Sequence, residues 1–146
     1  MRFIGRTSAE EGATLVEFAL IVPLLLLLII VILDLGRAVN AYVTVSNASR
    51  EGARYASVHP TASPSAIVAA VKTRSVPLDA SQLTVTATYY DGTAFRAWPP
   101  PASSPKPTAV PVRVQTTYSW SSVTFILGQF MASRNFTTSS TMDTIR

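Results

Sequence analysis

Hydrophobic positions are distributed very unevenly along this 146-residue chain. Sixteen consecutive residues that begin at Phe18 carry no polar side chain, and the apolar segment extends back to Ala13 with only Thr14 and Glu17 as interruptions. At 1.5 Å rise per residue, a helix of this length reaches about 30 Å, the thickness of the hydrocarbon core of a bilayer. We therefore predict a transmembrane segment over residues 13–34.

The apolar pattern continues beyond this segment in a different form. Apolar or small residues recur at spacings of three and four, which draws one stripe along an otherwise polar helix. The stripe consists of Leu35, Ala38, Tyr42, Val45, Ala48, Gly52 and Tyr55. We predict that residues 35–57 extend the same helix, which ends before His59-Pro60 because the residue before a proline is pushed out of the helical region. A folded lobe must cover the stripe.

Residues 63–146 are predicted to form that lobe. Ser63-Pro64 has the composition of a helix start, and Ile67, Val68 and Val71 give the short helix an apolar face. Residues 83–90 alternate between apolar and polar side chains with the period of two that is typical of a strand.

A second alternation covers residues 110–120, where Pro111 indicates an early or edge position. Residues 123–131 fit one helical face, and residues 136–142 fit a closing strand. The predicted fold is α+β: a long N-terminal helix packed on a small antiparallel sheet with one or two short helices.

A Pro-rich loop is predicted over residues 91–108. Asp91-Gly92 is a turn signal, and the five prolines between positions 99 and 107 favour extended backbone without strand partners. Phe95 and Trp98 in this loop are candidates for an exposed contact surface. The alternative is that these two aromatic rings fold back and cover the lobe's own core.

Composition argues against several classes of function. The 12 basic residues are scattered, so the net charge of +4 forms no patch that would bind nucleic acid. There is no cysteine and a single histidine, and the six carboxylates beyond residue 12 have no spacing typical of a catalytic dyad or metal site. We expect no enzyme activity, no metal and no cofactor.

Three interpretations of the apolar segment remain: a cleaved secretory signal, an ordinary anchor, or a helix that also works outside the bilayer. The segment is longer than a typical signal core. Asp34 and Arg37 can pair at i and i+3 and would mark the membrane boundary. Glu17 has two interpretations. A charge at the bilayer centre costs about 3 kcal/mol on insertion scales, but at the edge of the segment the cost is smaller and the side chain can snorkel to the headgroups, as in an ordinary anchor; the other interpretation is that Glu17 has a charged partner.

A cut after Gly12 would give Glu17 a partner. The new chain would begin at Ala13, and its free ammonium group could neutralise the Glu17 carboxylate of a neighbouring subunit inside an apolar bundle. Such a pair would set the axial register between subunits. Processing would then involve Gly12, Ala13, Glu17 and Phe18.

The residues that carry this argument resemble a known family. Gly12, four residues, then Glu17-Phe18 and an apolar run are similar to the prepilin-peptidase motif of type IV pilins. With Pro23, "DLGR" at 34–37 and "REGARYA" at 50–56, the segment from residue 12 to about 57 resembles the TadE-like minor pilins or pseudopilins of tight-adherence (Tad, Flp-type) pili.

The resemblance implies a pilin-like fold, a leader at residues 1–12 and removal of that leader by a prepilin peptidase. It further implies a single-pass protein of the bacterial cytoplasmic membrane, with a cytoplasmic N-terminus and an extracytoplasmic lobe. The implied partners are other Tad pilins and minor pilins, the pilus assembly platform and the lipid bilayer. The implied role is assembly of a cell-surface pilus used for adhesion.

A permanently anchored binding module is the alternative function. Such a module would display its C-terminal lobe and would never enter a fibre. The two hypotheses differ in the mass of the mature protein, which falls by residues 1–12 only if a prepilin peptidase cuts it.

Overall fold

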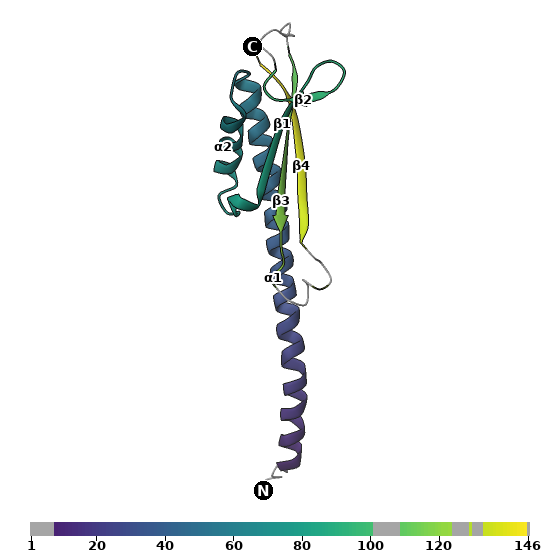
Figure 1. Ribbon diagram of the computed structural model, residues 1–146. Helices are drawn as coiled ribbons and strands as arrows, with labels where there is room; N and C mark the ends of the chain where they lie inside the picture. Colours follow the sequence, from purple (N-terminus) through teal and green to yellow (C-terminus); the bar gives the residue numbers. More distant parts are fainter. Residues whose placement is uncertain (1–7, 101–108, 124–128, 130–132, 146) are drawn as a thin grey trace.

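The protein is one long helix with a small α+β lobe on its C-terminal half (Figure 1). The computed structural model describes residues 8–100, 109–123, 129 and 133–145, and only the backbone of residues 8–10. In chain order the elements are α1 (Ser8–Val58), α2 (Pro64–Arg74), the 3-10 turn η1 (Ala80–Gln82), β1 (Leu83–Tyr90), β2 (Phe95–Ala97), β3 (Pro111–Trp120) and β4 (Arg134–Asp143).

Helix α1 is longer than predicted. It holds 51 residues and reaches about 76 Å. It begins at Ser8 instead of Ala13, because the intervening Ala and Glu residues are good helix formers and nothing there forces the helix to stop. It continues through Pro23 and ends at Val58, before His59-Pro60, as predicted.

The four strands form one antiparallel sheet in the order β2-β1-β3-β4. Strands β3 and β4 pair along their whole length, from Pro111 opposite Asp143 to Trp120 opposite Arg134. Strand β1 occupies residues 83–90, as predicted, and pairs with β3 from Leu83 opposite Tyr118 to Tyr89 opposite Val112. The closing strand was predicted in the right place but is longer at both ends.

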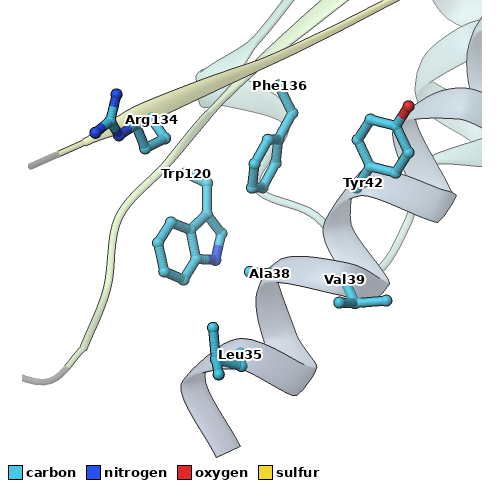
Figure 2. A pocket seen from close by; sticks show the side chains of 7 residues that line it. All are labelled: Leu35, Ala38, Val39, Tyr42, Trp120, Arg134 and Phe136. Carbon is cyan, nitrogen blue, oxygen red and sulfur yellow. The ribbon is translucent and has the colours of Figure 1, made fainter. Parts of the chain in front are cut away.

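One face of the sheet packs against α1, and α2 fills the space between α1 and β1. Near the middle of α1, Tyr42 meets Phe136 of β4 edge to face, with ring centroids 6.1 Å apart (Figure 2). Beside Phe136 lies Trp120, the last residue of β3. This aromatic group is the end of the lobe that faces the N-terminal half of α1.

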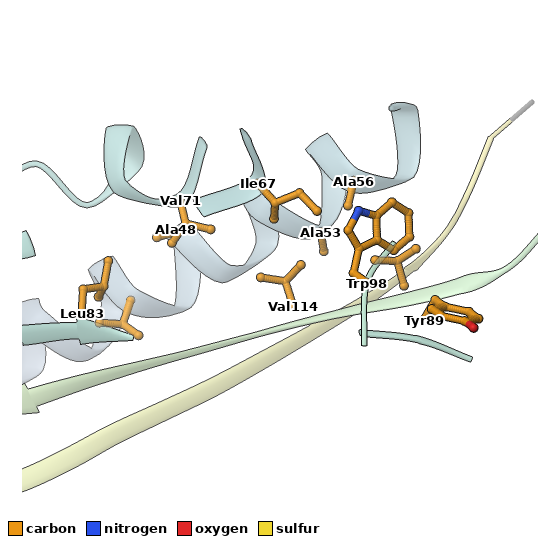
Figure 3. Close-up of a cluster of buried hydrophobic side chains, with 11 residues drawn as sticks. Ala48, Ala53, Ala56, Ile67, Val71, Leu83, Tyr89, Trp98 and Val114 are labelled. Carbon is orange, nitrogen blue, oxygen red and sulfur yellow. The ribbon is translucent and has the colours of Figure 1, made fainter. Parts of the chain in front are cut away.

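The hydrophobic core lies between the C-terminal half of α1, helix α2 and the sheet (Figure 3). Its fully buried aliphatic side chains are Val45, Ile67, Val71, Val112 and Val114. The α1 side of this core consists largely of small residues, namely Ala41, Ala48, Ser49, Gly52, Ala53, Ala56 and Ser57. Small side chains let the helix approach the sheet closely.

Gly52 shows how close this approach is. A Cβ atom at position 52 would lie 2.5 Å from Val71 Cγ2 and 3.1 Å from Val114 Cγ1. Ser49, three residues earlier, donates its hydroxyl to the Val114 carbonyl oxygen at 2.8 Å. The predicted stripe is therefore confirmed at Val45, Ala48 and Gly52.

Two other members of the predicted stripe are not covered. Leu35 is 48% exposed and Tyr42 is 52% exposed, because both line an open groove between α1 and the end of the sheet. At this end the lobe therefore leaves the apolar stripe only partly covered.

Helix α2 begins as predicted. Ser63 is its N-cap and accepts a hydrogen bond from the Ala66 N–H at 3.3 Å, and Pro64 is the first helical residue. Ile67 and Val71 are buried against α1, whereas Val68 is half-buried. The C-terminus is held near the end of α1, because the Ile145 N–H donates to the Ser57 carbonyl at 2.9 Å.

Two predictions about the lobe need correction or lie outside the described residues. Residues 91–108 were predicted as a loop, and this is wrong for Phe95–Ala97, which pair with the outer edge of β1 as β2. The helix predicted over residues 123–131 falls mostly on residues 124–128 and 130–132, which lie outside the part of the chain that the structure describes.

Candidate functional site

The N-terminal half of α1 projects away from the lobe (Figure 1). Its large apolar side chains are bare: Leu20 is 73% exposed and Leu24 is 69% exposed. By length and composition α1 can cross a membrane, and none of its most apolar window is buried within the fold. Because such a surface is unfavourable in water, this half of α1 fits a single-pass membrane anchor.

The four residues of the predicted processing site all lie inside this helix. A Cβ atom added at Gly12 would meet nothing within 4 Å, and Ala13 is exposed. Glu17 and Phe18 are exposed as well, and Glu17 makes no hydrogen bond or ion pair with the residues that the structure describes. Within one subunit Glu17 therefore has no counter-charge among these residues, and its pairing with Ala13 of a neighbour stays a prediction.

Asp34 lies where the bare half of α1 ends. Arg37 Nη1 donates to Asp34 Oδ1 at 3.1 Å, which confirms the predicted i, i+3 pair. The Asp34 side chain is only 4% exposed, whereas the Arg37 side chain is 56% exposed. Marking the membrane boundary remains the predicted role of this pair.

Asp34 has a second connection that the sequence did not reveal. The backbone N–H of Val123, just after β3, donates to the same Oδ1 atom at 3.3 Å. One carboxylate thus joins α1 to a segment 89 residues later in the chain. No motif in the sequence signals a contact between a side chain and the backbone at this separation.

An apolar groove opens next to Asp34, at the end of the lobe that faces the bare half of α1 (Figure 2). We call it the foot groove. It has a volume of about 250 Å³ and is lined by Leu35, Ala38, Val39, Tyr42, Trp120, Arg134 and Phe136. The groove was not predicted from the sequence, although the hairpin of the last two long strands places Trp120 opposite Arg134.

Trp120 is the most unusual residue of the foot groove. Its side chain is almost wholly buried, since only 5% of the residue is exposed, yet its indole Nε1 has no hydrogen-bond partner in the described structure. In Figure 2 the indole ring extends across the groove toward Ala38 of α1. A buried indole N–H usually has an acceptor, so this donor is an exception that needs an explanation.

The Pro-rich segment contributes a folded hairpin arm. Asp91 Oδ1 accepts the N–H groups of Thr93 and Ala94 at 2.8 and 2.7 Å, and Arg96 Nε donates to Asp91 Oδ2 at 2.7 Å. The Arg96 guanidinium and these N–H groups hold the pKa of Asp91 far below its usual range. Gly92 has a φ of 98°, a conformation that favours glycine in the turn.

The two aromatic residues of this arm, Trp98 and Phe95, are less exposed than a contact surface would require. Trp98 is 5% exposed and packs in the core, where its Nε1 donates to the Ala62 carbonyl at 2.8 Å. Phe95 is half-buried, with the Arg113 guanidinium carbon 3.6 Å above its ring centroid. For Trp98 the exposed-surface hypothesis is wrong, because its ring covers the lobe's own core.

The described residues contain no group of three or more His, Cys, Asp or Glu side chains that could hold a metal ion. The candidate site consists of surfaces: the bare half of α1, the buried Asp34 carboxylate at its end and the foot groove.

A long helix, apolar and bare in its first half and docked on a small antiparallel sheet in its second, defines an α+β protein with one candidate membrane span among the described residues. Residues 12–54 match the family described as TadE-like protein, which confirms the resemblance predicted from the sequence. The match covers the bare half of α1 and most of the docked half. Neither the curated proteins nor the solved structures give a match to this chain.

Proposed function

We propose that this protein is a minor pilin or pseudopilin that takes part in assembly of a Tad (Flp-type) pilus used for adhesion. Its role is structural and not catalytic. The observation that carries the proposal is the position of Glu17. Its side chain is exposed on the bare apolar half of α1 and has no counter-charge among the described residues. It lies four residues after Ala13, within the segment that matches the TadE-like family.

The energetic argument concerns Glu17. In a single membrane-bound subunit this carboxylate lies near one end of the span, where it can reach the headgroups. In a bundle of helices without water, an unpaired carboxylate is strongly unfavourable, and a cation from a neighbour offsets that penalty. The Ala13 amine that cleavage creates is such a cation, and it lies at the same end of the helix as Glu17.

Cleavage after Gly12 requires local unwinding. The peptide bond between Gly12 and Ala13 lies inside α1, which begins only four residues earlier at Ser8. The first turn of a helix lacks part of its hydrogen bonding, and glycine favours the helix less than alanine by about 1 kcal/mol. A prepilin peptidase can therefore open residues 8–12 without disturbing the membrane span.

The proposed topology follows from the same cut. The N-terminus lies in the cytoplasm, the bare half of α1 crosses the cytoplasmic membrane, and the lobe lies outside the cytoplasm. The partners are the peptidase, other Tad pilins and minor pilins, and the assembly platform, with the pilus at the cell surface as the destination.

Intact mass of the protein from cells with an active prepilin peptidase tests this proposal. We expect the mass to fall by that of residues 1–12 in the wild type and to stay full-length in Gly12→Leu. Gly36→Leu is the matched control, because both glycines lie in α1 with nothing within 4 Å of an added Cβ. A full-length wild-type species would favour the permanently anchored binding module.

Glu17→Gln tests the register step separately. This substitution removes the charge and keeps the size of the side chain, so membrane insertion should persist. We expect loss of surface fibres and loss of co-purification with partner pilins. Unchanged fibres and unchanged adhesion in this variant would overturn the role of Glu17.

A further inference from the structure

With residues 13–34 as the membrane span, the foot groove would lie at the height of the lipid headgroups. The bare half of α1 ends at Asp34, and the helix side of the groove runs from Leu35 to Tyr42, about 12 Å beyond that point along the axis. A bilayer is about 30 Å thick in its hydrocarbon core and about 40–45 Å with its headgroup layers, so each layer occupies about 5–8 Å. The lower part of the groove therefore falls within this layer.

The groove is continuous with the surface that faces lipid. Leu33, the last residue of the apolar run, is 63% exposed, and Val39 in the groove is also 63% exposed. Val123, at the foot of the lobe and bonded through its N–H to Asp34, is 76% exposed. On the face that carries Ile32, Leu35 and Val39, spaced three and four residues apart and all exposed, the apolar surface of the span passes into the groove, while the Asp34–Arg37 pair lies beside this face.

The chemistry of the groove matches a phospholipid. Tryptophan and tyrosine are enriched at membrane interfaces, and Trp120 and Tyr42 both line this groove. The rings of Trp120 and Phe136 also line the groove and give the start of an acyl chain an apolar surface to lie against. The exposed Arg134 guanidinium at the rim offers a positive charge to a phosphate.

We propose that the foot groove binds a phospholipid of the leaflet that α1 leaves at Asp34. The start of an acyl chain lies along Val39, Trp120 and Phe136, and the phosphate lies near Arg134. The lobe is then seated in the membrane interface instead of standing free above it. This inference depends on the membrane anchor and not on assembly into a pilus.

The two tryptophans of the chain give a matched pair of probes. Trp120 lies at the foot, whereas Trp98 bonds to Ala87 and Ala62 near the other end of the sheet. Ala87 pairs with Val114, six residues from Trp120 along β3, so the two rings are about 20 Å apart along the strands.

Full-length protein is reconstituted in vesicles of phosphatidylcholine and phosphatidylglycerol whose acyl chains carry bromine near the headgroup. Bromine quenches tryptophan fluorescence on contact. We expect strong quenching of Trp120 in Trp98→Phe and little quenching of Trp98 in Trp120→Phe. Trp98 lies in the core, so Trp98→Phe can unfold the lobe. The quenching of Trp120 is then obtained without this substitution, by subtracting the quenching in Trp120→Phe from the quenching in the wild type.

Iodide in the aqueous phase is the opposing probe. We expect Trp120 to be protected from iodide in vesicles. Quenching of Trp120 by iodide and not by brominated lipid would overturn the proposal. Trp120 could also be protected from both quenchers and lose this protection when the protein is diluted into excess lipid. This result would overturn the proposal and indicate that a second copy of this chain occupies the groove.

The phosphate contact has its own test. One basic residue near an anionic surface changes lipid affinity about fivefold, so brominated phosphatidylglycerol should quench Trp120 more effectively than brominated phosphatidylcholine. Arg134→Gln should abolish this preference, and Arg50→Gln, at an exposed arginine on the docked part of α1, should leave it intact. A preference that persists in Arg134→Gln would refute the contact with phosphate.

Discussion

The two halves of α1 belong to one uninterrupted helix but are built for different surroundings. The bare half, residues 13–33, carries large aliphatic side chains that the fold leaves exposed, such as Leu24 at 69%. The docked half, residues 41–57, buries small ones, with Ala48 and Ala53 at 0%. In this protein, large apolar side chains therefore mark the bare half, which fits a membrane anchor, and small ones mark the half that packs on protein.

The difference has a physical basis. Lipid accommodates side chains of any shape, so the bare half needs only apolar surface and length. A sheet offers a fixed surface, so a helix that packs on it at short range needs small residues where the backbones approach. The stability of the lobe should therefore depend strongly on the docked half and very little on the bare half.

The largest expected effect contrasts Ile67→Ala with Leu28→Ala. Ile67 of α2 is fully buried against the docked half, and its truncation should lower the free energy of unfolding of the lobe by about 2–5 kcal/mol. Leu28 in the bare half is 53% exposed, so the same truncation should leave that free energy unchanged. Urea unfolding in detergent micelles, followed by Trp98 fluorescence, measures both. Equal destabilisation would show that the halves are not independent.

Gly52→Ala should have the next largest effect. The added Cβ would lie 2.5 Å from Val71 Cγ2, so α1 and α2 must move apart, and such overpacking costs about 1–3 kcal/mol. Gly36→Ala, with nothing within 4 Å, should be neutral or slightly stabilising because alanine favours the helix. The same urea titration distinguishes them. A stable Gly52→Ala lobe would mean that the contact relaxes easily.

Asp34→Ala should have an effect of similar size, at the junction of the two halves. It removes the acceptor of both Arg37 Nη1 and the Val123 N–H, and loss of a buried, charged acceptor costs about 1–3 kcal/mol. Hydrogen exchange at the Val123 amide should accelerate. Glu51→Ala is the control, since Glu51 pairs with Arg54 at the same i, i+3 spacing but on the surface. Slow exchange at Val123 in Asp34→Ala would exclude this connection.

The sequence was sufficient to predict the elements whose signal is periodic. The end of α1, the start of α2 and the strand at residues 83–90 follow from proline positions and from alternation, and all were confirmed. The apolar run predicted a candidate membrane span, and α1 is long and apolar enough to be one; the family match covers the same segment from residue 12.

Features that depend on packing could not be predicted in the same way. The predicted stripe included Ala48 and Gly52, but the buried face of α1 is wider and also holds Ser49, Ala53 and Ala56, whose small or polar side chains give no hydrophobic signal. Strand β2 was missed because three residues among prolines give no alternation. The foot groove depends on the β3–β4 register, which places Trp120 opposite Arg134, and the hydrogen bond between Asp34 and Val123 joins residues 89 positions apart; neither is a local property of the sequence.

The smallest expected effect concerns the outer, solvent-facing side of the docked half. Arg54 donates to both carboxylate oxygens of Glu51, at 2.6 and 3.0 Å, and these hydrogen bonds lower the pKa of Glu51 below its ordinary value of 4.5. Because the pKa is depressed in the folded state, the pair stabilises the lobe above pH 4.5, and this contribution is lost as the pH falls through the folded pKa.

Glu51→Gln should therefore destabilise the lobe by a few tenths of a kcal/mol at neutral pH, the range for surface pairs within a helix, and the difference from wild type should vanish well below pH 4.5. High salt should also reduce it, because charges on the surface are screened. Melting temperatures of both proteins, measured in micelles across this pH range, provide the test. A difference that persists at low pH and in high salt would mean that Glu51 acts through packing on the lobe, and the outer side of the docked half would then contribute to stability as its buried side does.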